Sequence, residues 1–381
     1  MAYVDLLCYA LLAVTAAYVG VAISFRIGLS CPPPLPAVKT EPFVSVVVAA
    51  RNEEAYIGDC VDSLVGQTYP ADRFEVLIVD DGSEDRTADI VQHFAEQNAN
   101  VKALRVDGAF PEMAAKKRPM SVGNHAARGE IILTTDADCR VPDTWIASMV
   151  AHFEPDVCAV IGFSQIKNKG AVLNGVERLQ GLDFLALMSA TAGAANLGVA
   201  LAASGQNLAY RKQAFEQVGG FQRIGHRPSG DDVLLLQLMR RAAAGKVRFA
   251  TDPRSFAVTW RTESFLGLMR QRRRWASNAP LQARLNPPFF LYILTVFLVS
   301  ALIPVCALAG AGNRHLVWAL VCLGAKAAAD WLVIHKGARV FGRRDLLWSF
   351  PVWELVQIPY ILWVGLSGSL FGFVWKGRRH T

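Results

Sequence analysis

Acidic side chains follow several apolar stretches of this sequence, in an arrangement that could hold a cation and a diphosphate. Asp-Asp-Gly-Ser at 80–83 and Asp-Ala-Asp at 136–138 each follow a β-branched stretch, Glu53 follows an earlier one, and Asp231-Asp232 follows a Ser-Gly turn. Two carboxylates one residue apart can supply the oxygen ligands that Mg²⁺ or Mn²⁺ prefers. Such a cation can neutralise the charge of a departing diphosphate. Each motif alone is common in surface loops, but their order and positions together predict a catalytic site.

The elements that must position these carboxylates alternate between strand and helix. Short apolar, β-branched runs predict strands at Val44–Ala50, Glu75–Val79, Val101–Val106 and Glu130–Thr135. Helical spacing begins at Glu53, and Ser83 is predicted to cap the helix that follows it. This alternation predicts a parallel sheet wrapped by helices. In such sheets ligands bind beyond the carboxyl ends of the strands, which is where the carboxylates fall.

An apolar segment near the N-terminus, residues 4–25, has the length that a bilayer requires and is interrupted only by Asp5. No basic residues precede it, which favours a retained membrane anchor over a cleaved signal peptide. Arg26 follows it directly, so the positive-inside rule places the next part of the chain in the cytoplasm. Prolines are frequent in the stretch 31–42, which predicts a stiff, extended spacer.

Apolar character returns near the C-terminus. Residues 289–311 and 316–334 each match a membrane span, and the second contains Lys326 and Asp330, four apart on one helical face. We interpret them as an ion pair, with a role in binding an acceptor as the alternative. A third apolar stretch, 346–375, is long for one span and short for two. The sequence therefore leaves between two and four C-terminal passes open.

The composition agrees with an integral membrane protein. Hydrophobic residues make up 52% of the chain and charged residues only 19%. The net charge of +7 comes from separate basic clusters. Because we find no nucleic-acid-reading module in the sequence, we expect no nucleic-acid binding. The seven cysteines have neither metal-ligand nor disulfide spacing, so we expect free thiols in a reducing compartment.

Together the motifs resemble the membrane-bound branch of the family 2 glycosyltransferases, over residues 42 to 280. The opening of that family is similar to Val44–Glu54 followed by Leu77–Ser83. The remaining motifs follow in the family's order: Lys116-Lys117, Gly129–Ile132, Thr135–Asp138, Gly205–Arg211, Gly219–Phe221, Gly230–Asp232 and Gln271-Arg272-Arg273-Arg274-Trp275. The last of these matches the QxxRW motif and is the most specific. The resemblance implies an α/β GT-A fold, with a Rossmann-like, mostly parallel sheet in a cytoplasmic domain, plus transmembrane α-helices.

The resemblance also implies roles for single residues around the donor. Glu53, Asp80 and Asp81 would contact the nucleoside, which we expect to be uridine. Lys116 would approach the diphosphate. Asp136 would contact the ribose or the metal, and Asp138 would hold the metal, Mg²⁺ or Mn²⁺.

At the acceptor end, the resemblance makes Asp232 the general base, with Asp231 beside it in the catalytic motif. Asp232 would take the proton of the acceptor hydroxyl during a single displacement that inverts the anomeric centre. The QxxRW residues Gln271, Arg274 and Trp275 would line the acceptor end and cover the diphosphate. One departure from the family is Ala50-Arg51, where many relatives have Thr-Tyr, so no nucleoside contact is carried over to Arg51.

These interpretations divide the chain into six segments. We expect an N-terminal transmembrane helix at 1–26, a proline-rich linker at 27–42, a GT-A domain at 43–260, an amphipathic interfacial helix with QxxRW at 261–286, transmembrane or re-entrant helices at 287–375 and a basic tail at 376–381. The basic run 270–274 suits lipid headgroups as well as a diphosphate.

The expected function is metal-dependent, inverting hexosyl transfer from a UDP-sugar to a hydroxyl of a membrane lipid. The enzyme would lie in a bacterial-type inner membrane with its catalytic domain facing the cytoplasm. The alternative is a processive polysaccharide synthase of the poly-N-acetylglucosamine, cellulose or hyaluronan type, although three or four spans are few for a polymer tunnel. A catalytically silent scaffold is disfavoured because every acidic motif is intact. The expected partners are the donor, a lipid or glycan acceptor and the bilayer, and no partner subunit is identified.

Overall fold

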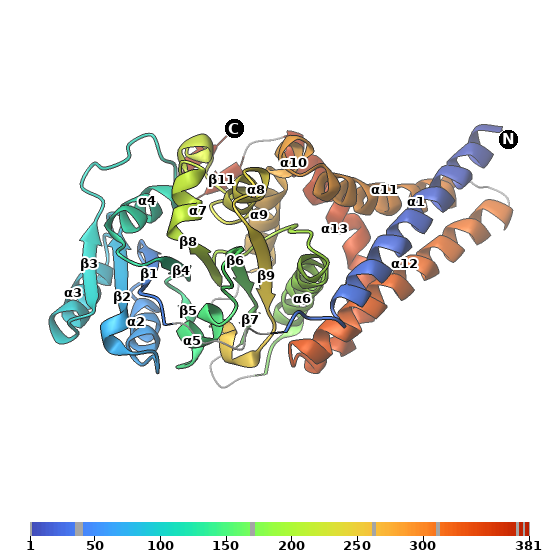
Figure 1. Cartoon of the computed structure of the whole chain (residues 1–381). Helices are drawn as coiled ribbons and strands as arrows, with labels where there is room; N and C mark the ends of the chain where they lie inside the picture. The colour runs from blue at the N-terminus through green and yellow to red at the C-terminus, as the bar shows by residue number, and fades with distance from the viewer. Residues whose placement is uncertain are drawn as a thin grey trace. The chain divides into compact units, whose positions relative to one another are not determined.

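The computed structural model describes residues 2–34, 41–167, 172–260, 264–309, 313–370, 373–375 and 378–380. It divides into two compact units (Figure 1). The sheet unit comprises Pro32–Val172 and Gly198–Thr262, and the helical unit comprises Met1–Cys31, Leu173–Leu197 and Glu263–Thr381. Most of the predicted proline-rich linker, at 35–40, lies outside the described residues, as do 376, 377 and 381 of the predicted basic tail.

A seven-stranded sheet in the order β3-β2-β1-β4-β8-β6-β9 forms the centre of the sheet unit. Its strands are β1 Val44–Ala50, β2 Phe74–Asp80, β3 Val101–Arg105, β4 Ile131–Thr134, β6 Val157–Gly162, β8 Leu208–Arg211 and β9 Lys246–Ala250. β1 pairs in parallel with both β2 and β4, whereas β8 is antiparallel to both of its neighbours. A small second sheet contains β5 Cys139–Arg140, β7 Ser164–Ile166 and β10 Ala257–Thr259. The predicted mostly parallel α/β sheet is confirmed.

Helices cover both faces of this sheet, because the side chains of each strand alternate between them. From β1, Val46 and Val48 join the core formed with Ile57 of α2. Val47 points the opposite way, and a Cβ added to Gly123 of α4 would lie 2.3 Å from it. Figure 1 shows α2 and α3 on one side of the strands and α4 on the other. The helices of the unit are α2 Ile57–Val65, α3 Thr87–Gln97, α4 Lys117–Ala126, α5 Trp145–Val150, α7 Lys212–Gln217 and α8 Val233–Arg241.

The predicted helix cap at Ser83 is wrong. α3 begins at Thr87, after the N-cap residue Arg86, and no side chain caps it. The Ser83 hydroxyl instead donates to the carboxylate of Asp80, which also accepts from the Ser83 N–H. The Ser83 hydroxyl oxygen accepts from the Asn52 N–H, so it joins two loops instead of the helix.

The helical unit consists of long helices and one terminal hairpin. Its helices are α1 Ala2–Gly28, α6 Gly175–Asn196, α9 Phe265–Ala276, α10 Ala279–Leu285, α11 Pro287–Ala309, α12 Asn313–Val340 and α13 Phe350–Leu370. The hairpin pairs β11 Phe373–Trp375 with β12 Arg378–His380. The segment predicted as one interfacial helix thus contains two helices, α9 and α10. Among the described residues, three helices are long and apolar enough to span a membrane: Asp5–Gly28, Pro287–Ala309 and His315–Val340.

Close approaches at glycine hold α6 among the other helices of this unit. A Cβ on Gly28 of α1 would lie 2.0 Å from the Gly193 carbonyl oxygen, and one on Gly193 would lie 2.3 Å from that of Phe25. A Cβ on Gly337 of α12 would lie 1.8 Å from the Ser189 hydroxyl oxygen. Small residues at such crossings let helix backbones approach closely. α6 therefore packs with α1 and α12. The segment that contains α6 was predicted to belong to the GT-A domain.

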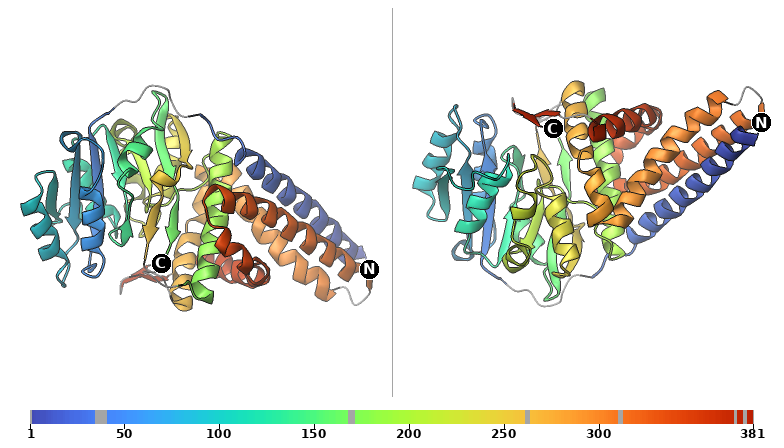
Figure 2. Two further views of the ribbon diagram at one scale, coloured as in Figure 1. Left: turned by 90° about the horizontal axis from the view of Figure 1, so that it is seen from below. Right: turned by 90° about the horizontal axis from the view of Figure 1, so that it is seen from above.

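A buried charge network joins α1, α12 and α13. The Lys326 ammonium is fully buried and lies 2.8 Å from both the Asp330 and the Glu354 carboxylates. It also donates to Gln357, and Tyr18 donates to Asp330. The predicted Lys326–Asp330 ion pair is confirmed, and Glu354 extends it to a helix that the sequence did not connect with it (Figure 2 shows α1 and α12 side by side).

Candidate active site

The loops after β1 and β2 are held together by side-chain to backbone hydrogen bonds. Asn52 adopts a left-handed backbone conformation with φ of 54°, its N–H donates to the Ser83 hydroxyl, and its side-chain oxygen accepts from the Glu84 N–H at 2.8 Å. The Glu53 N–H donates to the Thr87 hydroxyl at 2.8 Å. The loop that carries Glu53 and the turn that follows Asp80 and Asp81 are therefore joined along one side of the site. This brings Glu53 close to the turn that carries Asp80 and Asp81, as their predicted common role requires.

The two carboxylates of that turn have different partners. Asp80 is buried, and its carboxylate accepts from the N–H and hydroxyl of Ser83. Asp81 accepts from Arg118 of α4, whose Nη2 and Nε lie 2.6 and 3.1 Å from Asp81 Oδ1. Sequence reasoning missed Arg118, although it directly follows the Lys116-Lys117 pair and the basic run was a signal for it. Asp80 shapes the turn, while Asp81 is fixed by a cation.

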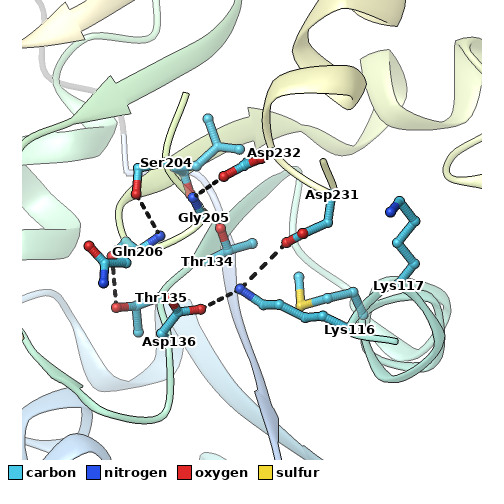
Figure 3. A network of polar contacts seen from close by, with 12 residues as sticks. Lys116, Lys117, Thr134, Thr135, Asp136, Ser204, Gly205, Gln206, Asp231 and Asp232 are labelled. Carbon is cyan, nitrogen blue, oxygen red and sulfur yellow. Dashed lines mark hydrogen bonds and ion pairs between the residues drawn. The ribbon is translucent and has the colours of Figure 1, made fainter. Parts of the chain in front are cut away.

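The predicted residues Asp136 and Asp231 both lie at the ammonium group of Lys116. Lys116 donates to Asp136 Oδ1, and its Nζ lies 3.5 Å from Asp231 Oδ2 (Figure 3). Asp136 comes from the loop after β4, and Asp231 from the turn before α8. Burial opposes the charge of Lys116, but the carboxylates of Asp136 and Asp231 outweigh it and raise its pKa. The lysine therefore stays protonated, and it links the loop that carries Asp136 to the turn that carries Asp231.

Asp232 lies next to this ion-pair cluster and is held by backbone groups. Its Oδ2 accepts from the Gly205 N–H at 2.9 Å (Figure 3). Its Oδ1 accepts from the Val233 N–H at 2.6 Å. Burial and the neighbouring Asp231 carboxylate raise the pKa of Asp232 to about 6, against the two N–H donors and Lys116, which lower it. A carboxylate with a raised pKa and a fixed orientation fits the properties of a general base.

Gly205 is a part of the site that sequence reasoning did not assign. A Cβ at this position would lie 3.1 Å from Lys116 Nζ and 3.4 Å from Asp231 Oδ2. The backbone thus passes close beside the ion pair while its N–H orients Asp232. The Gly205-Gln206-Asn207 run was noted in the sequence, but nothing in it showed which loops it would meet.

Lys117 has a different role from its neighbour Lys116. Its side chain is buried, and its ammonium donates to the Arg227 and Ser229 carbonyl oxygens at 2.7 and 2.9 Å. In Figure 3 it points away from the carboxylates. Because Ser229 directly precedes Gly230 and Asp231, this lysine fixes the turn that presents the third motif.

The residues after β4 fit a divalent cation. Asp136, Asp138 and Cys139 each place one ligand atom within 4.8 Å of the others. Burial and the two carboxylates raise the pKa of the Cys139 thiol, so at neutral pH it is a protonated, weak ligand. The two carboxylates supply the hard oxygen ligands that Mg²⁺ and Mn²⁺ prefer. The Asp136 carboxylate is also the ion-pair partner of Lys116.

The QxxRW residues Gln271, Arg274 and Trp275 lie on α9 of the helical unit. Between them, Arg272 is buried, with its Nη2 2.7 Å from Asp183 Oδ2 of α6. The Arg272 guanidinium carbon also lies 4.1 Å from the centre of the Trp275 ring, a cation–π contact. The predicted roles of Gln271, Arg274 and Trp275 toward acceptor and diphosphate stay predictions.

Comparison with known sequences finds a similarity to one family over part of the chain. Residues 45–219 match the sequence model described as Glycosyl transferase family 2. A beta-monoglucosyldiacylglycerol synthase of Synechocystis is 29% identical over 257 residues, which are 62% of this chain and 48% of that protein. A poly-beta-1,6-N-acetyl-D-glucosamine synthase of Staphylococcus epidermidis is 25% identical over 242 residues, which are 62% of this chain and 54% of that protein. The chain thus spans about half the length of these relatives.

Comparison with solved structures supports the fold. A mannosyltransferase from Pyrobaculum calidifontis, solved in complex with GDP-Man and Mn²⁺, superposes with a TM-score of 0.60 and 20% sequence identity. The match covers 95% of this chain and 98% of that one. The expected GT-A fold, a mostly parallel α/β sheet accompanied by long apolar helices, is confirmed.

Proposed function

We propose that this protein is a metal-dependent, inverting membrane glycosyltransferase, and the match of residues 45–219 to the family 2 glycosyltransferase model supports this proposal. Its donor is a UDP-sugar, and its acceptor is a hydroxyl group of a membrane lipid. The observation that carries the proposal is the convergence of Lys116, Asp136, Asp231 and Asp232 at the carboxyl end of the sheet.

On the donor side, each residue has a distinct task. Glu53, Asp80 and Asp81 form the wall that receives the nucleoside. Lys116 binds the diphosphate, and Asp136 and Asp138 hold Mg²⁺ or Mn²⁺. When bound, the cation neutralises the charge that develops on the diphosphate as it leaves. Gln271, Arg274 and Trp275 cover the diphosphate and line the acceptor end.

On the acceptor side, Asp232 takes the proton of the attacking hydroxyl. The hydroxyl oxygen bonds to the anomeric carbon while the bond from that carbon to the diphosphate breaks, so UDP leaves with the bonding electron pair. The two backbone N–H groups on Asp232 fix its carboxylate, which lowers the cost of reaching the reactive geometry. Attack from the face opposite the leaving group inverts the anomeric centre.

A lipid acceptor is supported by the membrane character of the chain and by its similarity to a beta-monoglucosyldiacylglycerol synthase. Three helices suffice to anchor an enzyme at the bilayer, where a lipid hydroxyl is within reach. Similarity to a poly-beta-1,6-N-acetyl-D-glucosamine synthase favours polymer synthesis as the second candidate. That activity requires a passage for the product, for which three spans are few.

A cytoplasmic orientation of the sheet unit is supported by the basic residues of the helical unit. Arg26 at the end of α1, Arg339 at the end of α12 and Arg344 surround His335. They therefore collect at one end of the candidate spans, and the positive-inside rule places that end in the cytoplasm of an inner membrane.

Purified full-length protein, incubated in detergent with Mn²⁺ and a panel of UDP- and GDP-sugars, tests the enzyme assignment. We expect release of UDP from one UDP-sugar, and no nucleotide release from the GDP-sugars. Asp232→Asn should lower transfer at least about 1,000-fold and preserve UDP binding, because the amide cannot accept the proton. Retained turnover would exclude Asp232 as the base, and a GDP-sugar as the only donor would refute the uridine assignment.

The acceptor classes are separated by mass spectrometry of the product. Lipid extracts of cells that carry active protein or Asp232→Asn should differ by a lipid that has gained one hexose. A high-mass polymer made only by the active protein would refute the lipid acceptor and establish the synthase alternative.

A further inference from the structure

The Lys116 ammonium lies between carboxylates that come from two separate loops. It donates to Asp136 Oδ1, and it lies 3.5 Å from Asp231 Oδ2 (Figure 3). Its side chain is 21% exposed, so it reaches solvent on one side. Asp136 is also one of the two carboxylates that fit a divalent cation, together with Asp138. The Asp136 carboxylate is therefore placed for two different cations.

Charge balance explains why a lysine occupies this position. Asp136, Asp231 and Asp232 lie around a partly buried space, and mutual repulsion of carboxylates is costly there. The single positive charge of Lys116 offsets part of that repulsion. A divalent cation that binds Asp136 while the ammonium stays in place meets a like charge within a few ångströms, and like charges repel more strongly in a partly buried site than in water.

The neighbouring lysine has entirely different partners from those of Lys116. Lys117 is buried and fixed on two carbonyl oxygens, and it holds the turn before Asp231. Lys116 stands at the N-cap of α4, after Ala115 in a left-handed backbone conformation with φ of 55°. Its four-carbon stem is flexible and ends in a compact charge. One lysine of the pair is an anchor, and the other is free to exchange partners.

We propose that Lys116 is an exchangeable counter-ion, which holds the cation position between Asp136 and Asp231 in the donor-free protein and turns to the diphosphate when metal and nucleotide bind. The inference rests on the proposed function. It makes binding of metal and nucleotide mutually dependent. Metal alone must displace Lys116 from Asp136, whereas metal with a diphosphate offers the ammonium a new anionic partner. Each ligand therefore raises the affinity of the protein for the other.

The test measures Mn²⁺ binding by electron paramagnetic resonance of free Mn²⁺, with full-length protein in detergent, in the absence and presence of UDP. The variants are Lys116→Met and Lys116→Gln, and the matched control is Lys102→Met. Lys102 pairs with Glu75, which is not a residue of the proposed site. We expect Lys116→Met and Lys116→Gln to bind Mn²⁺ alone at least about 5-fold more tightly than the unmodified protein. Their affinity for UDP with Mn²⁺, by calorimetry, should fall about 10-fold, and the control should change neither value.

The exchange predicts tighter binding of Mn²⁺ alone and weaker binding of UDP with Mn²⁺. A merely structural role of Lys116 would weaken both kinds of binding. Unchanged or weaker binding of Mn²⁺ alone by both variants, with melting temperatures near that of the control, would overturn the inference. If the unmodified protein binds no UDP in the presence of Mn²⁺, the proposed function itself fails. If UDP binds and no dependence on Mn²⁺ is found, only the exchange is refuted.

Discussion

The carboxylates of the site have different partners, and these partners suit them to different tasks. Asp80 accepts from its own turn, Asp81 from Arg118, and Asp136 from Lys116. Asp232 instead accepts from two backbone N–H groups. A carboxylate bound to a cation is a poor proton acceptor, because the cation stabilises its charged form. Burial and the Asp231 carboxylate raise the pKa of Asp232, which suits this carboxylate to proton transfer.

The raised pKa of Asp232 predicts how activity depends on pH. Burial and the Asp231 carboxylate raise this pKa from 3.8 to about 6, so below that pH the group is mostly protonated and cannot act as a base. We expect kcat/KM, which reports the free enzyme, to fall about tenfold per pH unit below about pH 6 and to level off above it. Rates of UDP release at low donor concentration, in buffers of constant ionic strength, measure this profile. A profile still flat at pH 5 would contradict the assignment.

At the scale of elements, the buried Arg272–Asp183 pair joins α9 to α6. The Arg272 side chain is 4% exposed, and that of Asp183 is 15% exposed. The same guanidinium stacks on Trp275, so the pair also orients the ring of the QxxRW motif. Breaking a buried pair from one side leaves an uncompensated charge, which is far more costly than losing a surface contact.

Arg272→Ala is therefore expected to destabilise the helical unit by about 3–5 kcal/mol. Arg270→Ala is the matched control, because Arg270 is an exposed arginine on the same helix, and its loss should shift the melting temperature by little. Thermal unfolding in detergent, followed by tryptophan fluorescence, measures both variants. Equal melting temperatures for the two would show that the pair contributes no stability.

Elements that show a local apolar pattern were predicted from the sequence, whereas groupings that depend on contacts between distant parts of the chain were not. The strands β1, β2 and β4 were predicted because buried parallel strands are nearly continuous apolar runs, whatever they pair with. The grouping of α6 with the membrane-type helices could not be predicted, since its partners Gly28 and Gly337 lie far away in the chain. The carboxylates of the site were found because they directly follow strands. Gly205 and Arg118 were missed because their roles arise only when separate loops meet.

At the scale of the whole molecule, the chain passes between the two units several times. The helical unit takes Leu173–Leu197 from the middle of the segment that forms the sheet unit. α6 buries Leu182, Leu185 and Met188 among its apolar residues. A fragment that contains α6 without α1 and α12 would expose this surface to water.

This arrangement predicts the behaviour of fragments. Residues 32–262 alone should aggregate, because the apolar surface of α6 lacks its partners. The same fragment with residues 173–197 replaced by a short Gly-Ser linker should be more soluble and should still bind UDP with Mn²⁺ through the sheet unit. Size-exclusion chromatography and calorimetry compare the two. A monomeric, well-folded fragment that retains α6 would refute this view of the helix.

The position of α6 also bears on the order in which the protein is made. When α6 leaves the ribosome, α1 is already present, so the contact between Gly28 and Gly193 can form at once. The contact with Gly337 must wait until about 140 further residues have been synthesised. During that interval the sheet unit is completed by β8 and β9 while α6 is held by α1 alone. The crossing of α1 and α6 can thus form before α11 and α12 have been synthesised.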